Sequence, residues 1–182
     1  MQGSDLDLLI NAARAAGEIA LRYWKRSPDF WEKEDGTGPV TVADLAVNEM
    51  LVSELRRARP DYGWLSEETP DTFERMTATR CFIVDPIDGT RAFMDGTPDF
   101  AHSLAIAEDG KVTAAVIYLP AQDRLYSAST KERATQNGVP MQVTAAPSVD
   151  GASVLTARPN LAPEHWREGA PPSVKRVFRS SL

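Results

Sequence analysis

Apolar residues near the start of the chain recur every three or four positions, which is the spacing of one face of an α-helix. Ser4 can cap this helix, and Asp7 stands three residues later, in its first turn. The predicted buried stripe consists of Leu6, Leu9, Ile10, Ala13, Gly17, Ala20, Leu21 and Trp24. A second amphipathic helix is predicted to begin at Thr41 and to run to about Arg57, before Pro60.

Short β-prone runs follow the second helix, and two of them flank Asp109-Gly110, the signal of a tight hairpin. Asn137-Gly138 marks a later turn. The predicted strands are Gly63–Ser66, Cys81–Val84, Leu104–Ala107, Val112–Tyr118, Leu125–Ala128 and Met141–Val143. This order predicts an α+β fold with two N-terminal helices packed on a mainly antiparallel sheet.

The composition changes to Ala, Pro and Ser from about Thr144, and Ser153–Thr156 is a candidate first strand of a second unit. We therefore predict an N-terminal domain over residues 1–145. Residues 146–182 are interpreted as the start of an incomplete C-terminal α/β domain.

The formal net charge of −6 disfavours binding to nucleic acid polymers, because an acidic surface repels phosphate backbones. The single cysteine, Cys81, cannot form an internal disulfide, which favours a reducing compartment. No apolar run approaches the ~20 residues that span a bilayer, and no basic region precedes an apolar stretch at the N-terminus. The prediction is a cytoplasmic protein without a membrane or nucleic acid partner.

The most informative run is Asp-Pro-Ile-Asp-Gly-Thr at positions 85–90, directly after the apolar residues 82–84. Pro86 biases Asp85 toward an extended conformation, which predicts a stiff turn in which Asp88 folds back toward Asp85. The glycine lets a backbone N–H approach a ligand closely, and the threonine adds a hydroxyl group. Two carboxylates beside exposed N–H donors suit a divalent cation with a phosphate next to it.

Two further acidic positions fall at predicted element ends. Adjacent residues on a strand point to opposite faces, so we predict that Glu67 enters the site and that Glu68 points elsewhere. Asp44 is the other candidate, three residues after Thr41. Each feature also has an ordinary structural explanation: Asp44 as a helix-dipole acid, Glu67-Glu68 as a solvated pair, and the run at 85–90 as a turn.

Motifs for other reaction types and metal sites match this sequence less well. The run at 85–90 also resembles the Asp-x-Asp-Gly-Thr motif of haloacid dehalogenase phosphatases, in which an aspartate is the nucleophile, although the second Asp comes one residue late. That alternative stays open. With only His102 and His165, a histidine-rich zinc site is excluded, and a Ser-His-Asp triad would depend on His102. We interpret His102 as a packed strand-edge residue and Cys81 as a small core residue.

Four blocks in order resemble the inositol monophosphatase superfamily of metal-dependent, lithium-sensitive phosphomonoesterases. The blocks are Lys33 with the Asp-Gly loop at 35–36, Pro39–Asp44, Leu65–Glu68 and Asp85–Thr90, and Asn137-Gly138 fits a family turn. The resemblance covers most of the chain. It implies a Mg²⁺-dependent phosphomonoesterase that hydrolyses a small phosphorylated polyol or nucleotide with metal-activated water.

The resemblance also implies a metal site with two or three Mg²⁺ ions. Glu67, Asp85 and the backbone carbonyl of Ile87 match the ligands of the first ion. Asp85 matches the residue that bridges to a second ion, together with Asp88. Oxygen ligands of this kind are those that Mg²⁺ prefers.

The implied catalytic residues are Asp44 and Thr90, which match the pair that positions and deprotonates the attacking water, together with Glu67. Backbone N–H groups of Gly89 and Thr90 match those that hold the phosphate. The implied phosphate- and substrate-binding residues are Gly89, Thr90, Arg91 and Lys33.

Two departures from the family pattern affect these expectations. Family members continue through a second α/β unit with a Trp-Asp segment that completes the second metal site, whereas no Trp is followed by Asp here. We therefore expect a truncated member, and a non-catalytic metal-binding fragment is the alternative from another class. After the Gly-Thr pair, inositol-specific members resemble Thr-Asn-Phe, whereas nucleotide-bisphosphate and histidinol-phosphate relatives tend to carry Lys or Arg. This chain has Arg91 there, so a bisphosphate nucleotidase and a histidinol-phosphate phosphatase are alternatives. Relatives are often homodimers, which implies a homodimer.

Overall fold

The computed structural model describes residues 3–33, 36, 38–143, 145, 147–156, 158–167, 171–174 and 176–178. The chain divides into two compact units, residues 1–141 and 142–182. Every candidate site residue lies in the first unit. The prediction of two domains that meet at residue 145 stays a prediction, and Asp35 of the predicted Lys33 loop lies outside the described residues.

The two long helices, α1 (Asp5–Tyr23) and α2 (Val42–Ala58), both begin with a capping box. The Ser4 hydroxyl accepts from the Asp7 N–H at 3.1 Å, and the Asp7 carboxylate accepts from the Ser4 N–H at 3.2 Å. Thr41 makes the equivalent exchange at the start of α2. The predicted starts of both helices are confirmed, because a cap is a local signal that satisfies N–H groups of the first turn.

A seven-stranded sheet follows the helices in the order β3-β4-β5-β6-β7-β8-β9, in which β3 is parallel to β4 and the remaining neighbours are antiparallel. Its strands are β3 (Gly63–Ser66), β4 (Arg80–Asp88), β5 (Ala101–Glu108), β6 (Lys111–Leu119), β7 (Arg124–Ser129), β8 (Thr135–Gln136) and β9 (Val139–Pro140). The smaller elements are β1 (Phe30–Glu32), β2 (Pro39–Thr41), α3 (Thr90–Met94) and the 3₁₀ turns η1 (Glu74–Thr77) and η2 (Pro120–Gln122). The second unit contains β10 (Ser153–Leu155), β11 (Arg176–Phe178), η3 (Arg158–Leu161) and η4 (Pro163–His165).

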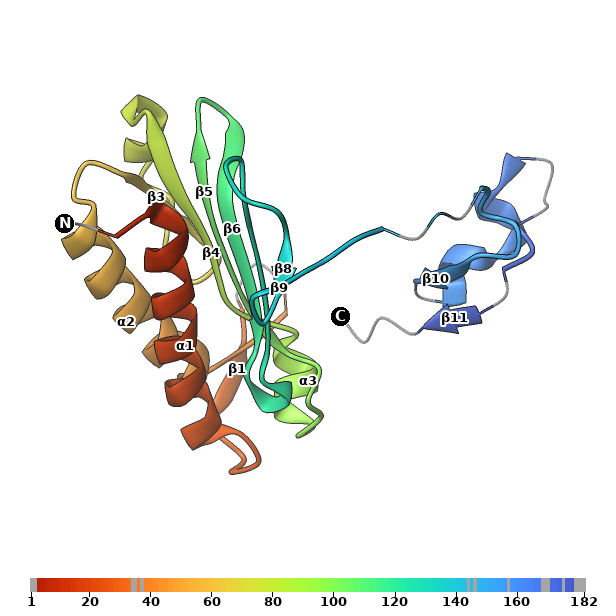
Figure 1. Ribbon diagram of the computed structural model, residues 1–182. Helices are drawn as coiled ribbons and strands as arrows, with labels where there is room; N and C mark the ends of the chain where they lie inside the picture. The colour runs from red at the N-terminus through yellow and green to blue at the C-terminus, as the bar shows by residue number, and fades with distance from the viewer. Residues whose placement is uncertain are drawn as a thin grey trace. The chain divides into compact units, whose positions relative to one another are not determined.

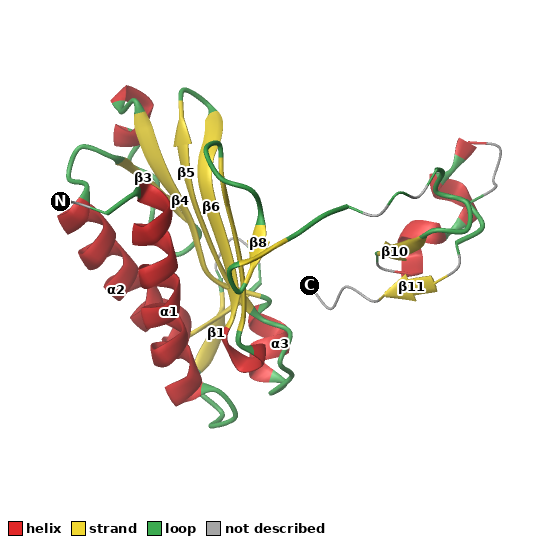
Figure 2. Ribbon diagram, viewed as in Figure 1, coloured by secondary structure: helices red, strands yellow, loops and turns green. Residues whose placement is uncertain are grey.

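Helices α1 and α2 lie side by side along one face of the sheet, as Figures 1 and 2 show. Buried apolar side chains fill the space between the two layers: Leu9, Ala13 and Ala16 on α1, Val47, Leu51 and Leu55 on α2, and Phe82, Val84, Leu104, Ile106 and Val116 on the sheet. Gly17 lets α1 approach β6 closely, because a Cβ at that position would lie 2.6 Å from Cε1 of Tyr118. This two-layer arrangement confirms the predicted α+β class.

Some details differ from the prediction. Met141–Val143 is wrong as a strand; the strand is β9 (Val139–Pro140), which begins directly after the tight turn at Asn137-Gly138, where both φ angles are positive. Leu21 is 39% exposed, so it does not belong to the buried stripe of α1. Cys81 is half-buried instead of a core residue, because strand alternation places it on the sheet face opposite to Phe82.

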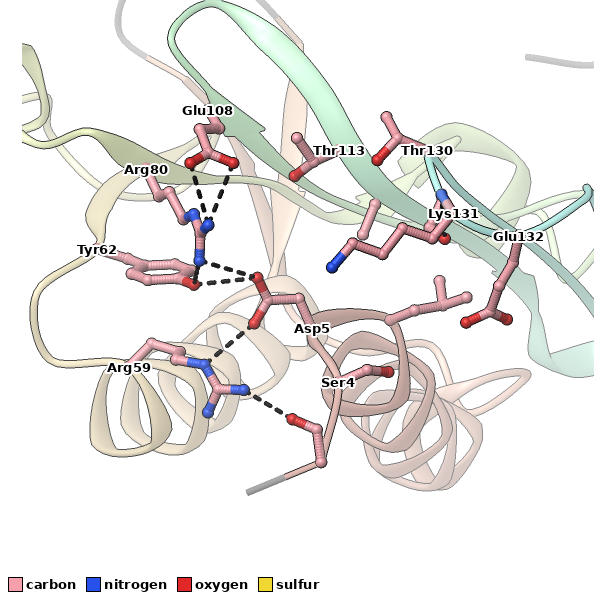
Figure 3. Close-up of a pocket in the computed structure, with 14 residues that line it drawn as sticks. Ser4, Asp5, Arg59, Tyr62, Arg80, Glu108, Thr113, Thr130, Lys131 and Glu132 are labelled. Carbon is pink, nitrogen blue, oxygen red and sulfur yellow. Dashed lines mark hydrogen bonds and ion pairs between the residues drawn. The ribbon is translucent and has the colours of Figure 1, made fainter. Parts of the chain in front are cut away.

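A polar network connects the start of α1 to the sheet and surrounds a cavity of about 330 Å³ (Figure 3). Asp5 accepts hydrogen bonds from Arg59 Nε and from the Tyr62 hydroxyl, both at 3.0 Å. Arg80 donates to the Tyr62 oxygen at 2.8 Å and forms an ion pair with Glu108 at 3.0 Å. The network lies at the first residue of β4, at the other end of this strand from the predicted site.

None of the described helices has both the length and the apolar character that crossing a membrane requires.

Candidate metal and phosphate site

Acidic residues from separate elements meet at the C-terminal end of β4. Strand β3 runs parallel to β4 with Ser66 opposite Val84, so the C-terminal ends of both strands lie at the same end of the sheet. The Glu67 N–H then donates to the Val84 carbonyl at 3.1 Å, which holds Glu67 next to the start of the acidic run. The carboxylates of Asp85, Asp88 and Glu67 are close enough that their charges act on one another.

Asp85 is at the centre of this group. Burial raises the pKa of its carboxyl well above the usual range, and the charges of Glu67, Asp88 and Asp44 raise it further. Its Oδ1 is buried and has no hydrogen-bond partner among the described residues. A buried carboxylate oxygen without a partner is costly, and a cation would remove that cost.

Lys33 meets both glutamates that follow β3. Its Nζ lies 2.6 Å from Glu67 Oε1 and 2.7 Å from Glu68 Oε1. Burial alone would lower the pKa of Lys33, but the hydrogen bonds and charges of the two glutamates raise it above its ordinary value. Lys33 therefore supplies a positive charge at the acidic cluster.

The expectation that Glu68 points away from the site is wrong. The Glu68 side chain is 7% exposed, whereas that of Glu67 is 46% exposed, and both face Lys33. Strand β3 ends at Ser66, so the two glutamates belong to a turn and do not alternate between sheet faces. Glu67 acts on Asp85, whereas Glu68 acts on Asp44, since its charge contributes to the raised pKa of that residue.

Asp44 enters the cluster from the first turn of α2. Its Oδ2 accepts from the Thr41 N–H at 2.9 Å and from the Thr41 hydroxyl at 2.6 Å. Burial raises the pKa of Asp44 to about 6, although the hydrogen bonds from Thr41 oppose the shift. A carboxyl group with this pKa can exchange a proton near neutral pH.

The Thr90 hydroxyl joins Asp44 to the acidic run on β4. Its Oγ1 lies 3.3 Å from Asp44 Oδ1 and 3.1 Å from the Ile87 carbonyl oxygen. The hydroxyl has one proton and both neighbours are acceptors, so Thr90 donates fully to only one of them. Gly89 caps α3 with φ 85°, a left-handed conformation that glycine adopts without steric cost. Arg91 follows on α3 and is exposed.

The acidic run at 85–88 is a strand with a bulge, which corrects the predicted turn. Strand β4 continues through Asp88, and its register with β5 shifts between the pairs Asp85–Ser103 and Asp88–Ala101. Two residues of β4 therefore lie opposite His102 alone. Bulges bend a strand and redirect its side chains, and they occur frequently beside active sites.

A divalent cation fits this group in donor type and in charge. The available donors are carboxylate and carbonyl oxygens, which Mg²⁺ prefers, and the partnerless oxygen of Asp85 lies among other carboxylates. In this conformation, no three His, Cys, Asp or Glu side chains of the described residues are gathered closely enough to hold a metal ion between them. Lys33 holds Glu67 at 2.6 Å in this conformation.

The sequence reasoning missed two residues of this environment. Strand alternation predicts that Glu68 points elsewhere, whereas the adjacent acidic pair is the signal that both side chains can enter. The Nδ1 of His102 donates a hydrogen bond to the Pro86 carbonyl. No local signal in the sequence connects these two residues, because the contact depends on the register of β4 and β5.

The family model described as "Inositol monophosphatase family" matches residues 3–180. This chain belongs to the inositol monophosphatase family. A histidinol-phosphatase of Chlorobaculum parvum is 35% identical over 152 residues, which are 83% of this chain and 58% of that protein. A 3′(2′),5′-bisphosphate nucleotidase, CysQ of Escherichia coli, is 35% identical over 127 residues, which are 68% of this chain and 51% of that protein.

The fold of the family is also found among solved structures. The structure of the Thermotoga maritima IMPase superposes with a TM-score of 0.83 at 28% sequence identity, over 97% of this chain and 68% of that one. The chain thus spans little more than half the length of the two curated relatives, at 58% and 51%. These matches establish the family and its fold.

Proposed function

We propose that this protein is a Mg²⁺-dependent phosphomonoesterase whose substrate is a small phosphorylated polyol or nucleotide. The observation that carries the proposal is the environment of Asp85, whose buried Oδ1 has no described partner and whose neighbours Glu67 and Asp88 are also acids. Repulsion among carboxylates gathered in this way favours a proton or a cation between them, and Mg²⁺ is a cation that oxygen donors suit.

We propose Glu67, Asp85, the Ile87 carbonyl and Asp88 as the residues that hold Mg²⁺. A divalent ion bound there would neutralise phosphate charge and make a water molecule acidic enough to act as a nucleophile. The buried position of Asp85 supports its role as the central ligand, since little bulk water competes there. Lys33 and the backbone N–H groups of the turn at 89–90 are proposed to contact the phosphate.

Asp44 and Thr90 are proposed to orient a water molecule and to accept its proton. The Thr90 oxygen can accept a hydrogen bond from water while its own proton is donated to Asp44 or to the Ile87 carbonyl. With a pKa of about 6, Asp44 is ionised at neutral pH and can take a proton through Thr90. No covalent bond between protein and phosphate is needed in this scheme.

Arg91 is proposed to contact a second anionic group of the substrate. It is exposed and directly follows the proposed phosphate-binding turn, where its guanidinium can reach a ligand. Relatives named as a histidinol-phosphatase and as a bisphosphate nucleotidase support these two substrates beside inositol phosphate. The homodimer and the cytoplasmic location stay predictions.

The test is phosphate release from inositol phosphate, adenosine 3′,5′-bisphosphate and histidinol phosphate, with Mg²⁺ and with EDTA. Asp88→Asn should abolish Mg²⁺-dependent release without unfolding the protein. Asp109→Asn is the matched control, because it removes the same charge at the β5–β6 turn, where a positive φ of 49° suits Asn as well as Asp. Retained release in Asp88→Asn, or no Mg²⁺-dependent release from any substrate, would contradict the proposal.

Two alternatives predict different results. A haloacid dehalogenase-type mechanism predicts a phospho-aspartyl adduct on Asp85, which trapping with acid quench would detect, whereas direct attack by water leaves none. The other alternative is a non-catalytic metal-binding role. Binding of Mn²⁺ without release of phosphate from any substrate would support that role.

A further inference from the structure

His102 is a fully buried polar side chain that the proposed chemistry does not use. It is 0% exposed and lies on β5, whose neighbouring inward residues Leu104 and Ile106 are apolar core residues. Burying an imidazole among apolar side chains costs free energy unless its polar atoms are satisfied. Its ring packs 6.4 Å from the Tyr118 ring, its register partner on β6, so its orientation is restricted.

The hydrogen bond of His102 goes to the bulge of β4. Asp85 pairs with Ser103 and Asp88 pairs with Ala101, so His102 is the single β5 residue opposite Pro86 and Ile87. The regular ladder is interrupted at a bulge, and a proline has no N–H to contribute. The His102 Nδ1 lies within hydrogen-bond distance of the Pro86 carbonyl and supplies a donor to this acceptor of the bulge.

The geometry also fixes the tautomer of the ring. A carbonyl oxygen can only accept, so Nδ1 carries the proton and the ring donates to Pro86. The other nitrogen, Nε2, is buried without a hydrogen-bond partner among the described residues. Burial favours the neutral ring and lowers the pKa of His102 to about 4, although the bond to Pro86 opposes the shift.

We infer that His102 is a positioning residue for the metal donors, because its Nδ1–H holds the peptide group between Pro86 and Ile87 in the orientation of the bulge. Three features depend on that peptide group: the direction of the Ile87 carbonyl, its contact with Thr90 at 3.1 Å, and the position of Asp88. The inference rests on the proposed function, since it assigns the Ile87 carbonyl and Asp88 to the metal. Residues that orient metal ligands typically change metal affinity by about 10- to 100-fold when they are removed.

The test compares His102→Asn with His102→Leu in the full chain. The Asn Nδ2 occupies the position of the His Nδ1 relative to the backbone and can donate to Pro86, whereas Leu has similar bulk and no donor. Calorimetric titration with Mn²⁺ should give an affinity about tenfold weaker or more for His102→Leu, and within about threefold of wild type for His102→Asn. Circular dichroism establishes that both variants are folded.

NMR of the ¹⁵N-histidine-labelled protein tests the hydrogen bond itself, with His165→Gln assigning the second histidine. A protonated Nδ1 and an unprotonated Nε2 at neutral pH are expected, and the opposite tautomer would overturn the inference even if His102→Leu fails to fold. Equal Mn²⁺ affinity in wild type and a folded His102→Leu would overturn the positioning role alone. An equal loss of Mn²⁺ affinity in both folded variants would show that the hydrogen-bond donor of His102 does not determine the affinity, and would overturn the positioning role. If the wild type binds no Mn²⁺, the proposed function and the metal-positioning role are both refuted. The tautomer of His102 would still test its hydrogen bond to the Pro86 carbonyl.

Discussion

Replacing Asp44 with Asn should stabilise the metal-free protein at pH 8. Asp44 is 1% exposed, and burial raises its pKa from 3.8 to about 6. A shift of roughly two units, at about 1.36 kcal/mol per unit, means that ionising Asp44 costs the folded state about 3 kcal/mol. In the wild type, the Thr90 oxygen lies between two acceptors, Asp44 and the Ile87 carbonyl. In the variant, the amide oxygen can accept from Thr41 and the amide nitrogen can donate to the Thr90 oxygen.

The sign of this effect depends on pH. An acid whose pKa is raised by folding binds its proton more tightly in the folded state, so stability falls as pH rises through the interval between the two pKa values. For Asp44 that interval runs from about 4 to about 6. The gain from Asp44→Asn should therefore be near zero at pH 4 and should reach at most about 3 kcal/mol at pH 8.

The assay is urea denaturation followed by tryptophan fluorescence in EDTA, at several pH values between 4 and 8. Asp71→Asn is a control of opposite sign, because hydrogen bonds from Arg75 and from the Phe73 N–H lower the pKa of Asp71. That variant should lose stability relative to wild type at pH 8. The reasoning is refuted if Asp44→Asn is less stable than wild type at pH 8, or if its gain is the same at every pH.

Three stability predictions follow from individual contacts. Gly17→Ala should lower the free energy of unfolding by about 1–3 kcal/mol, because the new Cβ would lie 2.6 Å from the Tyr118 ring. The ordinary gain of Ala over Gly in a helix has the opposite sign, so a rise in the urea midpoint would contradict this prediction. Thr41→Ala should cost about 1 kcal/mol through the lost cap of α2, and an unchanged melting temperature would show that the cap does not matter. Asp5→Ala should cost about 1–3 kcal/mol because Arg59 loses its 3.0 Å partner (Figure 3). Arg59 also donates to the carbonyls of Gly3 and Ala58, so Asp5→Ala combined with Arg59→Ala should lose more than Asp5→Ala alone but less than the sum of the two single variants.

The sequence was sufficient for features that neighbouring residues determine. Ser4 as the cap of α1 and Thr41 as the start of α2 are predictable because a cap involves residues only three positions apart. The turn at Asp109-Gly110 was identified because both residues tolerate the positive φ of a tight hairpin. The acidic residues could be selected as candidates because their order along the chain carries the family motif, which does not depend on knowing the fold.

Contacts between distant segments could not be read from the pattern. The approach of Thr90 to Asp44 joins positions 46 residues apart, and it follows from the packing of α2 against the end of β4. The ion pairs of Lys33 with Glu67 and Glu68 depend on the turn that follows β3, where the alternation rule for strands does not apply. The role of His102 depends on a one-residue shift in strand register, which local sequence does not specify.

The most direct measurement is a crystal structure of the protein grown with Mn²⁺, in which anomalous scattering locates the ion independently of any assumed ligand. Our account predicts an anomalous peak in direct contact with oxygen atoms of Asp85 and Glu67 and with the Ile87 carbonyl, and Lys33 no longer bound to Glu67. A peak bound by other residues, or no peak at a Mn²⁺ concentration that saturates the calorimetric titration, would contradict it.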